Sequence, residues 1–187
     1  MTVTIEGRKE VYRGWTTIHK LTLSDGAQTF TREVEDHGTA VAVLPYDPER
    51  RVVLLVSMPR APVLFVQAPA LLEVPAGLIE PGEAPEAAIR REAEEEAGVR
   101  LGTLEFVATL WSCPGLSTER ISLYLAPYGV SDRTGPGGGL LEENENITVV
   151  ETPLADLTAI LEGRTPADMK TFALSQALRL RCPHLFD

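Results

Sequence analysis

Residues 77–99 read GLIEPGEAPEAAIRREAEEEAGV, and this stretch decides the fold. Pro85 suits the first turn of a helix, and Gly98 suits the position just past a helix end. Together they predict a helix over residues 85–97. One side of this helix carries an apolar stripe, so it can pack on a sheet while its other side faces a cleft. The stripe consists of Ile89, Ala93 and Ala97.

Acidic residues crowd one face of the predicted helix. At 3.6 residues per turn, Glu95 and Glu96 lie about 60° to one side and about 40° to the other side of Glu92. Glu94 points away from them and is expected to face solvent. Carboxylates this close repel one another, and a divalent cation reverses that effect. The density of oxygen ligands suits Mg²⁺ or Mn²⁺, and a solvated charged face is the simpler alternative.

The spacing across this stretch resembles the Nudix box, the signature of the Nudix hydrolase family. Every fixed position of the box is matched, and the one soft position is Ala93, where a bulkier aliphatic residue is common. In the family, Glu83 and Arg91 form an ion pair that ties the loop to the helix. The matched residues are Gly77, Glu83, Arg91, Glu92, Glu95, Glu96, Gly98 and Val99.

The resemblance implies a reaction and a metal site. Nudix hydrolases cleave within the pyrophosphate of a nucleoside diphosphate linked to another group. Glu92 and Glu96 are expected as the main metal ligands, with Glu95 as a further ligand or a residue that positions water. The backbone carbonyl of Ala76 is expected to complete the set. Cations neutralise a pyrophosphate and lower the pKa of bound water, and a carboxylate base then finishes activating that water.

Segments outside the box resemble the ADP-ribose and GDP-mannose pyrophosphatases of this family. Pro114 lies in an SCPG turn where the subgroup has SPG, so Cys113 is an insertion relative to that pattern. The other segments are REVEDHG (residues 32–38), VSMPR (56–60), LLEVPAG (71–77) and GGLLEENENITVV (138–150). The resemblance implies ADP-ribose or a related nucleoside diphosphate sugar as substrate, with GDP-mannose as the alternative.

An acidic segment follows a run rich in glycine at residues 135–139. The resemblance implies that this segment folds over the site, with Glu143 as the catalytic base, Glu142 as the alternative base and Glu145 as a further metal ligand. Glu95 is the catalytic candidate within the box. Glycines free the backbone, so we expect the loop to be a mobile lid. A solvated acidic loop is the simpler alternative.

Candidates for substrate binding also lie outside the box. Arg60 presents a planar guanidinium suited to phosphate oxygens, and a surface salt bridge is its alternative role. The resemblance puts Arg32 near the substrate or the dimer interface and Glu73 near the substrate, and ordinary charges at strand edges or strand ends are the alternatives. The remaining candidates are the turn residue Pro114 and three aromatic side chains that could stack on a base or pack in the core, namely Tyr12, Trp15 and Phe30.

The composition limits the partners. A chain of 187 residues with 44% hydrophobic and 24% charged residues is typical of a globular protein. The net charge of -10 and the pI near 4.8 argue against nucleic acid as a partner. The spacing of the two cysteines does not indicate a disulfide framework. No apolar run approaches the length of a membrane span. The polar start MTVTIEGRKE lacks a signal-peptide core, so we expect a cytoplasmic protein.

The order of strand-like and helix-like segments predicts an α+β fold. With the resemblance, this becomes a Nudix-type α/β/α sandwich with a mixed β-sheet, plus N-terminal antiparallel strands. We expect residues 1–38 to form a strand region for dimerisation and the substrate pocket, and residues 39–187 to form the Nudix hydrolase domain. Closing helices are expected over residues 153–162 and 166–181. We expect a hairpin within residues 12–35, with its turn at residues 24–27, and it must pack on the main body or on a partner because an isolated hairpin is marginal. The resemblance implies a homodimer in which the N-terminal strands reach the partner.

A non-catalytic Nudix-fold module that only binds nucleotides is the alternative from a different class. Such a module is expected to carry a degenerate box, and the box in this chain is intact. The leading interpretation is therefore a Mg²⁺-dependent hydrolase that converts a nucleoside diphosphate sugar to a nucleoside monophosphate and a sugar phosphate.

Overall fold

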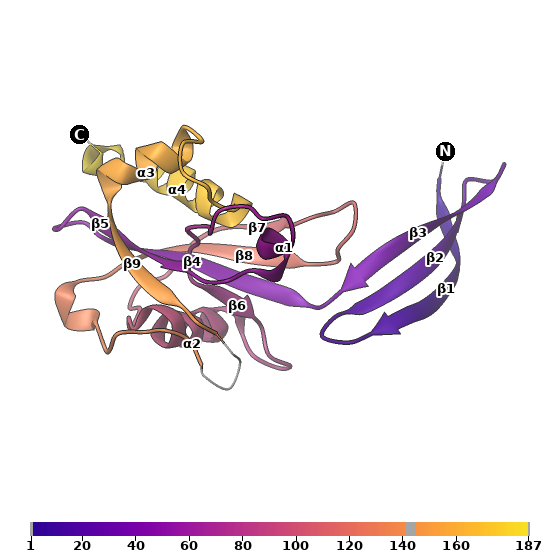
Figure 1. Cartoon of the computed structure of the whole chain (residues 1–187), viewed down its shortest axis with the longest axis horizontal. Coiled ribbons are helices and arrows are strands. Elements are labelled where there is room, and N and C mark those ends of the chain that lie inside the picture. Colours follow the sequence, from indigo (N-terminus) through magenta and orange to yellow (C-terminus); the bar gives the residue numbers. More distant parts are fainter. Residues whose placement is uncertain (1, 141–144, 187) are drawn as a thin grey trace. The chain divides into compact units, whose positions relative to one another are not determined.

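The computed structural model describes residues 2–140 and 145–186 of the chain, and Figure 1 shows its elements. The chain forms two compact units. Unit 1 consists of Met1–Thr39 and Leu110–Ile121, and unit 2 consists of Ala40–Thr109 and Ser122–Asp187. In the described part of the chain, no helix is both long enough and apolar enough to cross a membrane.

Unit 1 contains a three-stranded antiparallel sheet in the order β1-β2-β3. The expected hairpin is present as β2 (Thr17–Ser24) and β3 (Thr29–Asp36), and Asp25 in the turn accepts hydrogen bonds from two backbone N–H groups. The first strand, β1 (Thr4–Arg13), begins well before the expected strands. Its residues are almost all exposed, so no alternation of apolar and polar residues marked it in the sequence.

The segment from residue 112 to 119 belongs to unit 1 because it pairs with β3. The N–H of Glu35 donates to the carbonyl of Leu116 at 2.8 Å, and the N–H of Thr118 donates to the carbonyl of Glu35 at 3.0 Å. The hydroxyl groups of Thr16 and Ser117 donate to the Glu35 carboxylate. One carboxylate therefore joins the turn after β1 to this segment.

Unit 2 is built on a six-stranded mixed sheet with the order β7-β8-β4-β5-β9, in which β6 pairs with β4. Its central strands, β4 and β5, are continuous apolar runs that are buried on both faces. The strands are β4 (Thr39–Asp47), β5 (Val52–Ser57), β6 (Ala76–Leu78), β7 (Glu105–Trp111), β8 (Arg120–Pro127) and β9 (Thr148–Pro153).

Helices cover both faces of this sheet. Figure 1 shows α2 on one side and α3 and α4 on the other, so the predicted α+β sandwich is confirmed. The apolar stripe of α2 is fully buried against β4, β5 and β8. The helices are α1 (Ala61–Phe65), α2 (Pro85–Ala97), α3 (Leu154–Leu161) and α4 (Met169–Arg181), with short 3-10 turns at Val130–Asp132 and Pro183–Leu185.

The helix predicted from its proline and glycine signals has the expected bounds. It begins at Pro85 and is closed by Gly98, whose φ of 61° is left-handed. The last helix begins three residues later than expected, at Met169, because the side chain of Asp168 accepts the N–H of Thr171 at 2.8 Å and caps the helix there.

Candidate active site

Strand β6 carries the backbone of the candidate site to the acidic face of α2. Ala76 pairs with Ala42 of β4, and its N–H donates to the Glu96 carboxylate at 2.9 Å. A Cβ atom at Gly77 would overlap the carboxylate of Glu92. A larger residue at this position would therefore displace the carboxylate of Glu92.

Two of the box glutamates are shielded from solvent, Glu96 almost completely and Glu92 in part. Glu96 is 2% exposed, and burial raises its pKa to about 8, with the hydrogen bond from Ala76 opposing the rise and the charges of Glu92 and Glu145 adding to it. Burial also raises the pKa of Glu92, although Arg91 opposes this change. Burying a carboxylate beside other carboxylates is unfavourable unless positive charge compensates it.

Arg91 supplies part of that positive charge. Its guanidinium forms the predicted ion pair with Glu83, at 3.1 Å, so that prediction is confirmed. The same group lies 2.7 Å from a Glu92 oxygen and 3.2 Å from a Glu95 oxygen. Arg91 thus links the loop before the helix to two of the clustered carboxylates and partly compensates their repulsion.

Glu145 joins the cluster from a distant part of the chain. The N–H of Leu140 donates to its carboxylate at 3.3 Å, and its negative charge acts on both Glu92 and Glu96. Glu142 and Glu143, the candidate catalytic bases, lie outside the described residues. The structure therefore brings together Glu145 and the box glutamates, and it leaves the identity of the base as a prediction.

The glycine-rich run before the acidic segment packs against the end of α2, whereas the expected lid falls largely on residues 141–144, outside the described part of the chain, and stays a prediction. The N–H groups of Gly138 and Gly139 donate to the carbonyls of Glu96 and Glu95, at 2.9 and 3.1 Å. Residues 137–139 are therefore held against the end of α2. The backbone freedom of glycine serves a close approach here rather than a free hinge.

The donor set fits a hard divalent cation. Within residues 2–140 and 145–186, no three acidic, histidine or cysteine side chains converge as a metal-binding group, and Arg91 holds Glu92 and Glu95. Even so, the nearly inaccessible carboxylate of Glu96 lies in the field of two others, and the carboxylate of Glu92 fills the space that a side chain at residue 77 would take. Oxygen donors and uncompensated negative charge are the features that Mg²⁺ and Mn²⁺ require.

Arg60 and Glu73, two predicted substrate contacts, bind each other. The guanidinium of Arg60 donates to both oxygens of Glu73, at 2.9 and 3.0 Å, and Lys170 donates to the same carboxylate at 2.7 Å. Burial alone would raise the pKa of Glu73, but the hydrogen bonds and charges of Arg60 and Lys170 outweigh it and lower the pKa to about 2. The charge of Arg60 also acts on Glu96.

Sequence reasoning missed Lys170 and its neighbour Asp168, which form an ion pair at the start of α4. Lys170 is separated from Glu73 by 97 positions, so no local pattern indicates the contact. The available signal was the helix cap, because an aspartate before an apolar periodic segment is a typical N-cap.

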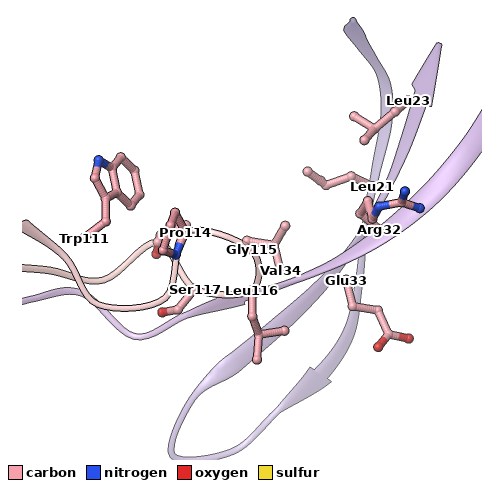
Figure 2. A pocket seen from close by; sticks show the side chains of 11 residues that line it. Leu21, Leu23, Arg32, Glu33, Val34, Trp111, Pro114, Gly115, Leu116 and Ser117 are labelled. Carbon is pink, nitrogen blue, oxygen red and sulfur yellow. The ribbon is translucent and has the colours of Figure 1, made fainter. Parts of the chain in front are cut away.

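Arg32 and Pro114 both belong to unit 1 and line the same pocket. It is an open pocket of about 330 Å³ between strands β2 and β3 and the segment from Trp111 to Thr118, shown in Figure 2. Arg32 shares its face of the sheet with Leu21, its partner across the strands, whereas Glu33 points to the opposite face, as strand alternation requires. The residues that line the pocket combine several apolar ones with one basic residue, Arg32, and one acidic residue, Glu33.

The aromatic candidates of unit 1 do not line this pocket. Tyr12 is 58% exposed and Trp15 is 82% exposed, so neither packs in the core of its own unit. The ring of Trp15 lies 4.7 Å from the ring of His37 at a tilted angle. Phe30 is partly buried, with the guanidinium of Arg32 4.9 Å from its ring centre.

Known proteins are similar in sequence to this chain. The NUDIX domain family matches residues 36–173. A GDP-mannose pyrophosphatase of Cronobacter sakazakii is 38% identical over 166 residues, which cover 87% of this chain and 85% of that protein. An ADP-ribose pyrophosphatase of Haemophilus influenzae is 36% identical over 157 residues, which cover 79% of this chain and 72% of that protein.

A GDP-mannose pyrophosphatase of Escherichia coli is 34% identical over 172 residues, which cover 90% of this chain and 87% of that protein. The family match and these similarities extend over both the acidic helix and the strands around it. The chain therefore belongs to the Nudix family.

Proposed function

We propose that this chain is a Mg²⁺- or Mn²⁺-dependent pyrophosphatase that hydrolyses ADP-ribose or a related nucleoside diphosphate sugar. The products are a nucleoside monophosphate and a sugar phosphate. The names of the relatives, which are pyrophosphatases of ADP-ribose and GDP-mannose, support this substrate class. Nudix hydrolases generally use divalent metals.

One observation carries the proposal. The Glu96 carboxylate is almost inaccessible to water and lies in the field of two further carboxylates, those of Glu92 and Glu145. Such an arrangement is costly for the protein alone and becomes favourable when cations are bound among the oxygens. We assign the binding of the cation to the carboxylates of Glu92, Glu96 and Glu145 and the carbonyl of Ala76, with Glu95 as an additional ligand.

A bound divalent cation supplies neutralisation of the pyrophosphate and a coordinated water of lowered pKa. The protein supplies the remaining parts. Arg60 binds phosphate oxygens through the guanidinium N–H groups that Glu73 does not use, while Glu73 holds the guanidinium in place through Nε and Nη2. A carboxylate takes the proton of the attacking water, and we assign this role to Glu143, with Glu142 and Glu95 as alternatives.

The test compares two glutamates of the same helix. Glu96→Gln is expected to lower kcat by at least about 100-fold, because it removes a charged ligand from the reacting centre. Glu94→Gln is the matched control, since Glu94 faces solvent and its one ion pair among the described residues is with Arg100, at 3.4 Å. Products are identified by phosphorus NMR, and folding is checked by circular dichroism. Equal loss in both variants, or no loss in Glu96→Gln, contradicts the assignment.

GDP-mannose is the second candidate substrate. Two of the three relatives described above are GDP-mannose pyrophosphatases, and these two cover more of this chain than the third. Assays of ADP-ribose and GDP-mannose side by side, with Mg²⁺, decide between them through the ratio of kcat/KM. If neither compound is hydrolysed but one binds, the chain is a nucleotide-binding module rather than an enzyme.

We further propose that the protein acts as a homodimer in the cytoplasm. Strand β1 exposes apolar side chains that its own unit leaves uncovered, and both cysteines are free thiols. The candidates for contacts to base and sugar are Arg32, Tyr12 and Trp15 of unit 1 and Glu73 of unit 2. A monomeric mass by light scattering at micromolar concentration contradicts the dimer.

A further inference from the structure

The end of α2 is closed by a helix cap and by a second set of hydrogen bonds from a distant loop. Gly98 already forms a left-handed cap, in which its N–H and that of Val99 donate to the carbonyls of Glu94 and Ala93. The carbonyls of Glu95 and Glu96 receive separate donors, the N–H groups of Gly139 and Gly138. The loop therefore binds the backbone of the two residues whose side chains form the acidic cluster.

Only glycine can make this contact. Residues 137–139, which we call the glycine clamp, have φ angles of 70°, 120° and 75°, a region that other residues rarely adopt. A Cβ atom on Gly137 would lie 2.9 Å from the Cα atom of Ala97 and would overlap the carbonyl oxygen of Glu96. The clamp approaches the helix backbone to a distance that no side chain permits.

The clamp also contacts Glu145 from its other end. A Cβ atom on Gly139 would lie 2.8 Å from the Cβ atom of Glu145. Leu140, the next residue, donates its N–H to the Glu145 carboxylate, and Ile147 donates its N–H to the carbonyl of Gly138 at 3.4 Å. Glu145 thus lies against Gly139 and is held by the N–H of Leu140, the residue that directly follows the clamp.

We propose that the glycine clamp is a positioning element that sets the separation between Glu145 and the carboxylates of Glu92 and Glu96. This inference rests on the proposed metal-binding function of those glutamates. Backbone contacts through the clamp connect the two distant segments. They keep the distance between the carboxylates fixed, although the carboxylates repel one another. Side-chain contacts alone would let Glu145 swing away toward water, since its carboxylate is not buried.

The test uses two glycines of the same loop. Gly137→Ala forces the clamp away from the helix, whereas a Cβ atom on Gly135 meets nothing within 4 Å and its φ is not left-handed, so Gly135→Ala is the matched control. Mn²⁺ affinity is measured by electron paramagnetic resonance. We expect Gly137→Ala to weaken it about 10-fold or more, the range seen when residues that orient metal ligands are changed, and Gly135→Ala to change it less than twofold.

A double-mutant cycle asks whether the clamp acts through Glu145. If it does, Gly137→Ala adds little to the loss of Mn²⁺ affinity already caused by Glu145→Gln. The variants Gly137→Ala and Glu145→Gln are both expected to lower kcat with a smaller change in KM, because substrate contacts at Arg60 remain. Additive losses, or equal affinities of the two alanine variants, overturn the proposal.

Two further measurements keep the outcome clear. Loss of Mn²⁺ binding in Glu96→Gln tests the metal site itself, so a failure of the clamp can be told apart from a failure of the proposed function. If Gly137→Ala does not fold, hydrogen exchange of the unaltered protein decides. We expect the amides of Gly138 and Gly139 to be protected as strongly as the last turn of α2, and exchange at unprotected rates overturns the clamp.

Discussion

Replacing Glu73 with glutamine is expected to cost the protein about 3 kcal/mol of stability at pH 7. Glu73 is 3% exposed and accepts hydrogen bonds from Arg60 and Lys170, which lower its pKa from an ordinary 4.5 to about 2. Each pKa unit is worth about 1.4 kcal/mol, so this difference corresponds to about 3 kcal/mol. Glutamine keeps the shape but removes the anion that Arg60 pairs with and leaves Lys170 paired with Asp168.

The pH dependence gives the prediction its sign. A carboxylate whose pKa is lowered by folding stabilises the protein fully above its unfolded pKa, near 4.5, and loses that contribution as pH falls toward about 2. At pH 3 about 2 kcal/mol of the stabilisation by Glu73 is already gone. The gap in stability between the original protein and Glu73→Gln should therefore narrow on acidification.

The assay is urea unfolding followed by circular dichroism, at pH 7 and at pH 3, without divalent cations. Glu151→Gln is the matched control: Glu151 pairs with Arg50 at the surface, and such a pair contributes at most about 1 kcal/mol. A loss below about 1 kcal/mol at pH 7 for Glu73→Gln, or the same loss at both pH values, refutes the reasoning.

Three other substitutions test separate parts of the structure. Gly77→Ala should lower turnover at least about 10-fold, because the new methyl group displaces the carboxylate of Glu92, whereas Gly102→Ala enters open space and should leave the rate unchanged. Asp168→Ala should lower the free energy of unfolding by about 1–2 kcal/mol through loss of the helix cap, measured in urea. Leu174→Ala, at a fully buried position, should cost about 2–5 kcal/mol in the same assay, and a smaller loss would mean that the core collapses around the gap.

Local signals in the sequence were sufficient for the acidic helix. Pro85 and Gly98 act within one turn of the helix ends, and the box glutamates are spaced by the helix itself, so neither depends on the rest of the fold. The hairpin β2–β3 was predicted for the same reason, since its turn and its alternation are local. Strand β1 was missed because an exposed sheet face does not impose an apolar pattern.

Contacts between distant segments were beyond local signals. The group of Arg60, Glu73 and Lys170 joins three separate segments of the chain, and each member taken alone is an ordinary charged residue in the sequence. Arg60 and Glu73 entered as two substrate contacts through the resemblance, without any indication that they pair. Such a pair forms only when the chain has folded, because burial makes an unpaired carboxylate costly.

The glycine clamp shows why one residue type can support opposite predictions. Glycine permits motion, and a run of glycines beside an acidic segment therefore predicts a mobile lid. Glycine also permits contact between backbones, and this is the property that Gly137 uses against Ala97. The choice between the two depends on whether the freed N–H groups find acceptors, and the last turn of a helix offers unpaired carbonyls for them. A glycine run is therefore better interpreted together with the helix ends available to it than by its composition alone.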